Sequence, residues 1–242
     1  MTAPLPFRPA FPSGTLADAG LNRLAVLDID TLPPEIRQTL GQYITDLPAY
    51  QQLLLVGHGG RRLWECVQAS DTTSAHPIDS YTVHTLQQHF SRHLPKLRFR
   101  FIYPGEQPLG LQQLGALAGW HQPSLLRIGI DREWGSWSAY RAVVLCDSDF
   151  APTKRVDRDN PCDHCAEQAC IQHCPAAAVS REALALERCL EARLAESSPC
   201  QYTCLARCAC PVGKQHQYET AQMRHVYGAS LHWIRQHRAP AD

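Results

Sequence analysis

The distribution of cysteine constrains this chain more than any other feature. The sequence has 242 residues and 11 cysteines, and nine of the cysteines lie between Cys162 and Cys210. Only Cys66 and Cys146 lie outside that stretch, and we expect both to be buried apolar side chains rather than ligands. In a chain that stays in the cytoplasm, such a concentration of thiols indicates metal or redox chemistry more often than disulfides.

The charge balance and the apolar runs exclude several classes of protein. Lys+Arg and Asp+Glu both total 23, so no net charge attracts nucleic acid or an acidic membrane surface. The first residues do not combine a charged region with an apolar run, so we expect no signal peptide. The apolar runs at 53–56 and 142–146 are too short to span a bilayer. We therefore expect a cytoplasmic protein without nucleic-acid or membrane partners, of unknown oligomeric state.

The cysteines form two groups along the chain. The first reads Cys162-x2-Cys165-x4-Cys170-x3-Cys174 and is followed by Pro175. The second group comprises Cys189, Cys200, Cys204, Cys208 and Cys210. Four closely spaced cysteines that end in Cys-Pro are typical of bacterial ferredoxins, although the usual run has two residues, not four, between its second and third cysteines. Each cubic cluster takes four thiolates, so the nine cysteines suffice for two [4Fe-4S] clusters.

A rule from two-cluster ferredoxins predicts which thiols share a cluster. In those proteins the fourth cysteine of each run binds the cluster of the other run. The first cluster is then held by Cys162, Cys165, Cys170 and Cys210. The second is held by Cys174 with three of Cys189, Cys200, Cys204 and Cys208. Structural zinc and disulfides remain as alternatives, although zinc sites commonly use paired C-x2-C motifs and this stretch has one.

Helix and strand patterns mix up to about residue 150, which predicts an α/β layer structure. We expect helices at 34–47, 61–69, 80–94 and 111–118, and strands at 52–57, 97–103, 125–130 and 139–146. The first 20 residues look like an arm, because they are rich in Pro, Gly and Ala. The polar segment 151–161 separates a domain of residues 1–150 from one of residues 151–242, which ends in a helix at 217–237.

One block outside the cysteine stretch resembles known families. The block from Gly119 to Leu145 resembles the strand–turn–strand of epoxyqueuosine reductases, which read Gly-Trp, an apolar strand, Gly-Ser-Trp and another strand. Residues 135–145 are also similar to the Gly-x-Trp-x-Ala-x-Arg-x-Val-Val-Leu stretch of CblC-type cobalamin-processing proteins. The cysteine-rich stretch directly after the block is the arrangement of epoxyqueuosine reductases, and its Cys-Pro-Val-Gly end resembles uncharacterised bacterial ferredoxin-like iron–sulfur proteins.

This resemblance implies a fold, a ligand set and a second cofactor. The fold is a nitroreductase- or CblC-like sheet with flanking helices, followed by a small ferredoxin-like domain of helices and loops. In epoxyqueuosine reductases a lone cysteine between the two runs, preceded by arginine, serves the second cluster, and Cys189, preceded by Arg188, matches it. The second cluster would then take Cys174, Cys189, Cys200 and Cys204, which leaves Cys208 spare.

The second cofactor that the resemblance implies is cobalamin. The cobalamin-binding candidates are Trp120, Ser124, Arg127, Gly135, Trp137 and Arg141. Tryptophan rings could stack on the flat macrocycle, and glycine allows the backbone a close approach. The alternative is that the tryptophans are core residues and that Arg141 pairs with an acid.

These observations predict an iron–sulfur oxidoreductase that passes single electrons to a bound cobalamin or corrinoid and receives them from a partner protein. Residues 101–108 lack the catalytic aspartate of epoxyqueuosine reductases, so we do not expect that reaction itself. Two alternatives are an electron-transfer ferredoxin without its own substrate and a zinc-stabilised interaction module. Four histidines near the C-terminus are expected to belong to a solvated helix face rather than to a metal site: His216, His225, His232 and His237.

Overall fold

The structure is a computed structural model that describes residues 7–156 and 158–238. The described residues form two compact units: residues 7–119 and 139–156 make up the first, and residues 120–138 and 158–238 the second. This division differs from the expected boundary at residue 150, because residues 120–138 pack with the cysteine-rich part of the chain. No helix in the described part is long and apolar enough to cross a membrane.

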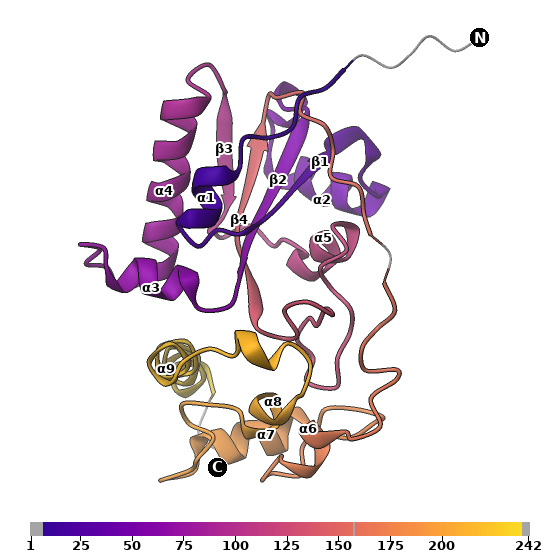
Figure 1. The fold of residues 1–242 in the computed structure, drawn as a ribbon, viewed down its shortest axis with the longest axis vertical. Helices are drawn as coiled ribbons and strands as arrows, with labels where there is room; N and C mark the ends of the chain where they lie inside the picture. The colour runs from indigo at the N-terminus through magenta and orange to yellow at the C-terminus, as the bar shows by residue number, and fades with distance from the viewer. Residues whose placement is uncertain (1–6, 157, 239–242) are drawn as a thin grey trace. The chain divides into compact units, whose positions relative to one another are not determined.

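A four-stranded antiparallel sheet forms the centre of the first unit (Figure 1), and its strand order is β1-β2-β4-β3. The strands are β1 (Arg23–Asp28), β2 (Gln52–Gly59), β3 (Phe99–Tyr103) and β4 (Ser138–Cys146). Leu24 lies opposite Val56 in the first pair, and Phe101 lies opposite Val144 in the last. Every residue of β2 is buried, because this strand has a neighbour at each edge and a helical layer on each face.

Helices cover both faces of this sheet, which confirms the predicted α/β layers (Figure 1). One face carries α1 (Gly14–Asp18), α3 (Arg62–Gln68) and α4 (Pro77–His93), and the other carries α2 (Pro34–Tyr43) and α5 (Leu111–Leu117). Short 3-10 helices span Ile29–Thr31 and Leu47–Ala49. The four predicted helices are therefore present. Helix α4 begins earlier than expected, at Pro77, because the fixed φ of proline suits the first turn.

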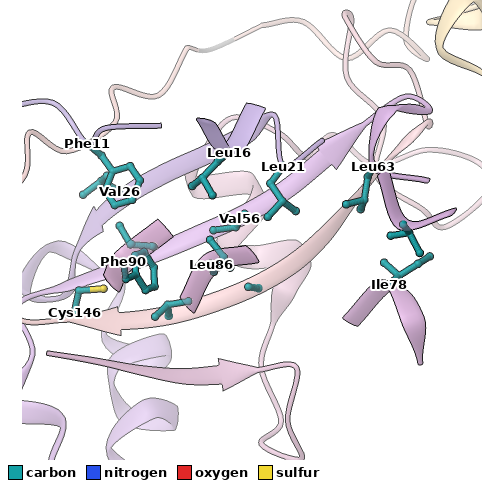
Figure 2. Close-up of a cluster of buried hydrophobic side chains, with 14 of the residues drawn as sticks. Phe11, Leu16, Leu21, Val26, Val56, Leu63, Ile78, Leu86, Phe90 and Cys146 are labelled. Atoms are coloured by element: carbon teal, nitrogen blue, oxygen red, sulfur yellow. The ribbon is translucent and has the colours of Figure 1, made fainter. Parts of the chain in front are cut away.

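The core of the first unit lies between the sheet and α1, α3 and α4 (Figure 2). Val56 of β2 and Val144 of β4 pack there against Leu86 and Phe90 of α4, and each of these side chains is at most 1% exposed. Cys146 belongs to the same cluster, and burial raises the pKa of its thiol to about 12. This confirms the expectation that Cys146 is a buried apolar side chain, whereas Cys66 is only half-buried.

Two N-terminal features differ from the sequence-based expectation. The predicted arm is wrong for its described part, because Phe11 is buried in the core and the segment forms α1, which buries Leu16 in the same core. The edge strand β1 was not predicted. Arg8 donates two hydrogen bonds to the Asp28 carboxylate, at 2.8 and 2.7 Å, and so ties the N-terminal segment to the end of β1.

The second unit consists of helices and loops. Its helices are α6 (Ala169–Gln172), α7 (Leu186–Leu194), α8 (Leu205–Ala209) and α9 (Thr220–His237), with a 3-10 helix at Lys214–His216. The helix at the C-terminal end is confirmed, with Met223, Leu231 and Ile234 buried along one side. The assignment of this unit to the ferredoxin-like class stays a prediction.

The predicted strand at 125–130 is wrong, because the segment folds as a turn. The Ser124 hydroxyl donates to the Ile128 carbonyl oxygen at 2.7 Å, and Arg127 has a φ of 58°. Only isolated bridges remain in this stretch of the described chain, such as the one between Gln122 and Ile130. The apolar residues that suggested a strand instead serve the cysteine-rich unit, where Leu126 and Ile128 line a cavity.

The core predicts a sharp contrast between two adjacent positions of α4. Leu86 is fully buried, whereas Gln87 is exposed. We expect Leu86→Ala to lower the free energy of unfolding by about 2–5 kcal/mol, because it leaves a cavity. The control Gln87→Ala should change it by less than about 0.5 kcal/mol. Urea denaturation followed by circular dichroism measures both, and equal effects of the two variants would contradict this description of the core.

Candidate metal centres

All eleven cysteines are free thiols, so the disulfide alternative finds no support in the structure. The members of the first expected ligand set come from three places. Cys162 and Cys165 lie in the loop before α6, Cys170 lies in α6, and Cys210 directly follows α8. The Asn160 side-chain oxygen accepts a hydrogen bond from the Cys162 N–H at 3.0 Å and shapes this loop. Helices α6 and α8 pack together, which brings the distant Cys210 to the loop.

The thiols of the first set influence one another's pKa. Burial raises the pKa of Cys162, and the like charges of Cys210, Cys170 and Cys165 raise it further. Burial also raises the pKa of Cys170, and here too Cys210 and Cys165 add to the effect. Like charges influence a pKa in this way when they lie near the group. The assignment of these four thiols to one cluster stays a prediction.

The second set lines one cavity of about 190 Å³. Cys174, Cys189, Cys200 and Cys204 all contribute to its wall, while Cys208 does not. Most of the remaining wall is apolar: Leu126, Ile128, Pro175, Ala176, Ala178, Val179, Leu184, Ala192, Leu205 and Ala206. Burial raises the pKa of Cys189, and the charges of Cys204, Cys174 and Cys200 also raise it. The segments that supply these thiols are far apart in sequence, and the fold brings them to one enclosed space.

Cys208 lies outside this cavity, although it is only one helical turn from Cys204. It lines a separate hollow of about 400 Å³, together with Tyr202 and Met223. Its sulfur lies 3.6 Å from the Thr203 hydroxyl oxygen. The role of Cys208 as the spare thiol stays a prediction.

The residues present fit iron–sulfur cubes. Thiolates are the preferred ligands of such clusters, and four are available at each site. Among the described residues, no three His, Cys, Asp or Glu side chains converge closely enough to hold one metal ion. A zinc site gathers its donors about 2.3 Å from a single ion, whereas a cube presents four separate corners to four thiolates. Zinc stays an alternative for these thiols.

A buried arginine forms part of the wall of the second cavity, and the sequence analysis missed it. Arg207 is 7% exposed, and its guanidinium donates to the Ser136 carbonyl oxygen at 2.5 Å and to the Ser136 hydroxyl at 3.3 Å. The same group lies over the Trp137 ring, 4.3 Å from its centroid. The positive charge of Arg207 favours the thiolate form of Cys204, which opposes the rise in its pKa that burial causes. No local sequence motif indicates this role, because Ser136, which accepts two of its hydrogen bonds, lies 71 positions earlier in the chain.

A second arginine reaches the same cavity from α7. Arg193 donates to the Tyr227 carbonyl oxygen at 2.8 Å and to the Ser230 hydroxyl at 3.0 Å. Its charge favours the thiolate forms of Cys189 and Cys200, against the rise in pKa that burial causes. The second thiol set therefore has two cations beside it.

The six cobalamin-binding candidates divide between the two units. Arg141 belongs to the first unit, where it donates to His58 Nδ1 at 3.1 Å and lies 3.9 Å from Asp79, which is the ion pair of the alternative interpretation. The other five belong to the second unit. Trp137 is fully buried and packs on Tyr218, so its ring has no free face for a macrocycle. Trp120 is half-buried and Arg127 is exposed. Cobalamin binding by these residues stays a prediction.

Gly135 holds the loop that carries Cys210. It has a φ of +58°, and a Cβ at this position would collide with the Val212 carbonyl oxygen. Gly213, with a φ of +65°, makes the reciprocal approach to the backbone at Trp134. Gly135 was expected to allow the backbone to approach cobalamin closely. In the structure it allows a close approach of the backbone at Val212.

The C-terminal histidines make local contacts in the structure. The His216 ring lies against Trp134, with 4.3 Å between ring centroids, and His237 Nδ1 is 2.9 Å from the Trp233 carbonyl oxygen. His232 is exposed on α9. His232 and His237 thus lie on the exposed side of α9 as expected, whereas His216 lies in the preceding 3-10 helix.

The Gly135 contact predicts a stability difference between two glycines of the second unit. Gly135→Ala should cost at least about 1–3 kcal/mol, because the residue needs a positive φ and the Cβ has no room. Gly228→Ala is the control, since it lies within α9 and its Cβ would make only ordinary contacts at 3.5 Å. Thermal unfolding measures both variants. An unchanged melting temperature for Gly135→Ala would contradict the contact.

Comparisons with known proteins identify the fold. No family model matches the chain, and no curated protein matches it in sequence. The structure is similar to epoxyqueuosine reductase from Bacillus subtilis, with a TM-score of 0.53 and 13% identity over 85% of this chain and 65% of that chain. The enzyme from Streptococcus thermophilus gives a TM-score of 0.52 and 11% identity over 83% of this chain and 64% of that one. This chain thus spans less than two thirds of the length of these reductases.

A second class of reductase shares the fold. A reductive dehalogenase whose structure suggests a mechanism for B12-dependent dehalogenation gives a TM-score of 0.51 and 12% identity, over 89% of this chain and 33% of that chain. At such identities the likeness shows the fold alone. A further epoxyqueuosine reductase was solved with a tRNA stem loop, and the expected absence of a nucleic-acid partner for this chain stays a prediction.

Proposed function

We propose that this protein is an iron–sulfur oxidoreductase that holds two [4Fe-4S] clusters and delivers single electrons to a cobalamin or corrinoid. The observation that carries the proposal is the grouping of the thiols. Four thiols line one cavity and four others influence one another's pKa, and both observations support the crossed sets that the cysteine pattern and the family resemblance predict. When bound, each cluster supplies one-electron chemistry.

The residues around the thiols would bind and shield the clusters. Backbone N–H groups of Leu125, Ile171 and Val212 donate to the sulfurs of the first set and so favour their thiolate forms. In the second set the Ala178 N–H lies 3.4 Å from the Cys174 sulfur. The apolar wall of the cavity keeps water from this set. Burial and hydrogen bonds to sulfur are the means by which a protein adjusts cluster potentials.

The cobalamin half of the proposal is supported by the fold, which resembles that of epoxyqueuosine reductases and of a reductive dehalogenase linked to B12. A specific observation favours a second candidate, an electron-transfer ferredoxin without its own substrate. Trp137 is buried in the core, and so one of the two tryptophans expected to stack on the macrocycle is occupied. Both candidates require a partner protein that donates electrons.

Metal analysis tests the cluster half. Anaerobically purified protein should contain about eight iron and eight sulfide per chain, because each of two cubes has four of each. Cys204→Ser removes a thiol from the second cavity and should lower both counts by about half. Cys208→Ser is the matched control, since it removes a thiol one turn away that lies outside the cavity. Protein that holds zinc and no iron would overturn the proposal.

A titration with cobalamin distinguishes the two candidates. Cob(II)alamin added to the cluster-loaded protein under dithionite should show a shifted visible spectrum and saturable binding. If clusters are present and the cobalamin spectrum does not change, the ferredoxin candidate replaces the cobalamin reductase. Equilibrium dialysis measures the same binding independently of any reduction.

A further inference from the structure

The two thiol sets differ in the charges that surround them. Arg207 and Arg193 both line the cavity of the second set. For the first set, the main charges that act on Cys162, Cys170 and Cys210 are those of other thiols. The second site thus combines four thiols with two cations, whereas the described surroundings of the first supply chiefly backbone N–H donors.

The two cations are not neutralised by acids. Arg207 bonds only to uncharged groups in the described part of the chain, namely Ser136 and the Tyr227 hydroxyl at 3.5 Å. Arg193 likewise bonds to Ser230 and to the Tyr227 backbone. Burying a cation without a counter-ion is costly, so a buried arginine normally has an anionic partner. Nothing else in the wall of this cavity supplies negative charge except the thiolates.

We propose that Arg207 and Arg193 are the counter-ions of the second cluster and make it the more easily reduced of the two. This inference rests on the proposed function. Reduction adds one negative charge to a cluster that is already anionic through its thiolates, and nearby positive charge stabilises the product more than the reactant. Because the wall of the cavity is largely apolar, the attraction is screened less than it would be at an open surface.

This difference in charge sets the direction of electron transfer between the two clusters. When the protein holds a single electron, that electron resides on the cluster of Cys174, Cys189, Cys200 and Cys204. The transfer moves one electron and breaks no bond: the cluster of the first set loses the electron that the cluster of the second set gains. Arg207 and Arg193 act through their charge and are positioning residues, since neither supplies a ligand.

Redox titration of the cluster-loaded protein tests the inference. Anaerobic titration with dithionite, followed by electron paramagnetic resonance, should give two midpoint potentials for the wild type. Arg207→Gln and Arg193→Gln should each lower the higher midpoint potential by about 59 mV. For a one-electron couple this corresponds to a tenfold change in the ratio of oxidised to reduced cluster. The lower midpoint should move much less, because its cluster has other surroundings.

Charge-preserving variants separate charge from packing. Arg207→Lys and Arg193→Lys should shift the higher midpoint by less than half as much as the glutamine variants. Arg188→Gln is a further control, since Arg188 adjoins Cys189 in sequence but is exposed and lies outside the cavity wall. It should leave both midpoints unchanged.

The outcomes separate this inference from the function on which it rests. Wild-type protein without iron overturns the proposed function. Wild-type protein with about eight iron, but with glutamine variants that leave the higher midpoint unchanged or shift both midpoints equally, overturns only the inference. Equal shifts for lysine and glutamine variants also overturn it. If Arg207→Gln fails to fold or loses iron, the half-buried Arg193 pair of variants decides the question by the same criteria.

Discussion

The approach of two backbone stretches, one at Trp134 and Gly135 and the other at Val212 and Gly213, is the constraint on which the cysteine-rich unit depends. Both glycines have positive φ, and neither position has room for a Cβ. This contact ties residues 120–138 to the chain just after Cys210, the thiol that completes the first set. Together with the packing of α6 against α8, it places Cys210 beside three cysteines that lie 40 or more residues earlier.

The same tie places a cation beside the second set. Residue 136 follows Gly135 directly, and the carbonyl oxygen of Ser136 accepts the hydrogen bond of Arg207. Trp137 then covers the guanidinium with its ring. Ser136 and Trp137 reach Arg207 because they directly follow Gly135 in the same loop. The block 119–145 was expected to bind cobalamin. Its residues Ser136 and Trp137 also hold Arg207, whose charge lies in the wall of the second cavity.

Local pattern predicted four of the five α-helices and three of the four strands described in the first unit, because their apolar periodicities agree with their final burial. It failed at 125–130, where an apolar run packs against cysteines instead of pairing in a sheet. It failed also at β1, whose partner lies beyond an intervening helix, and at α1, a five-residue helix kept in place by burial of Leu16. In each case the local structure depends on a contact with residues that are distant in sequence, and the local pattern does not encode that contact.

The sequence by itself determined that nine of the eleven cysteines lie between residues 162 and 210 in two groups, since number, spacing and the Cys-Pro pairs are local properties. It also indicated that Cys146 is a core residue. Only the tertiary structure decided that Cys208 lies outside the second cavity, that Trp137 is buried and that Arg207 and Arg193 are the cations beside four thiols. Burial and electrostatic surroundings depend on segments that meet in space, and no spacing along the chain encodes them.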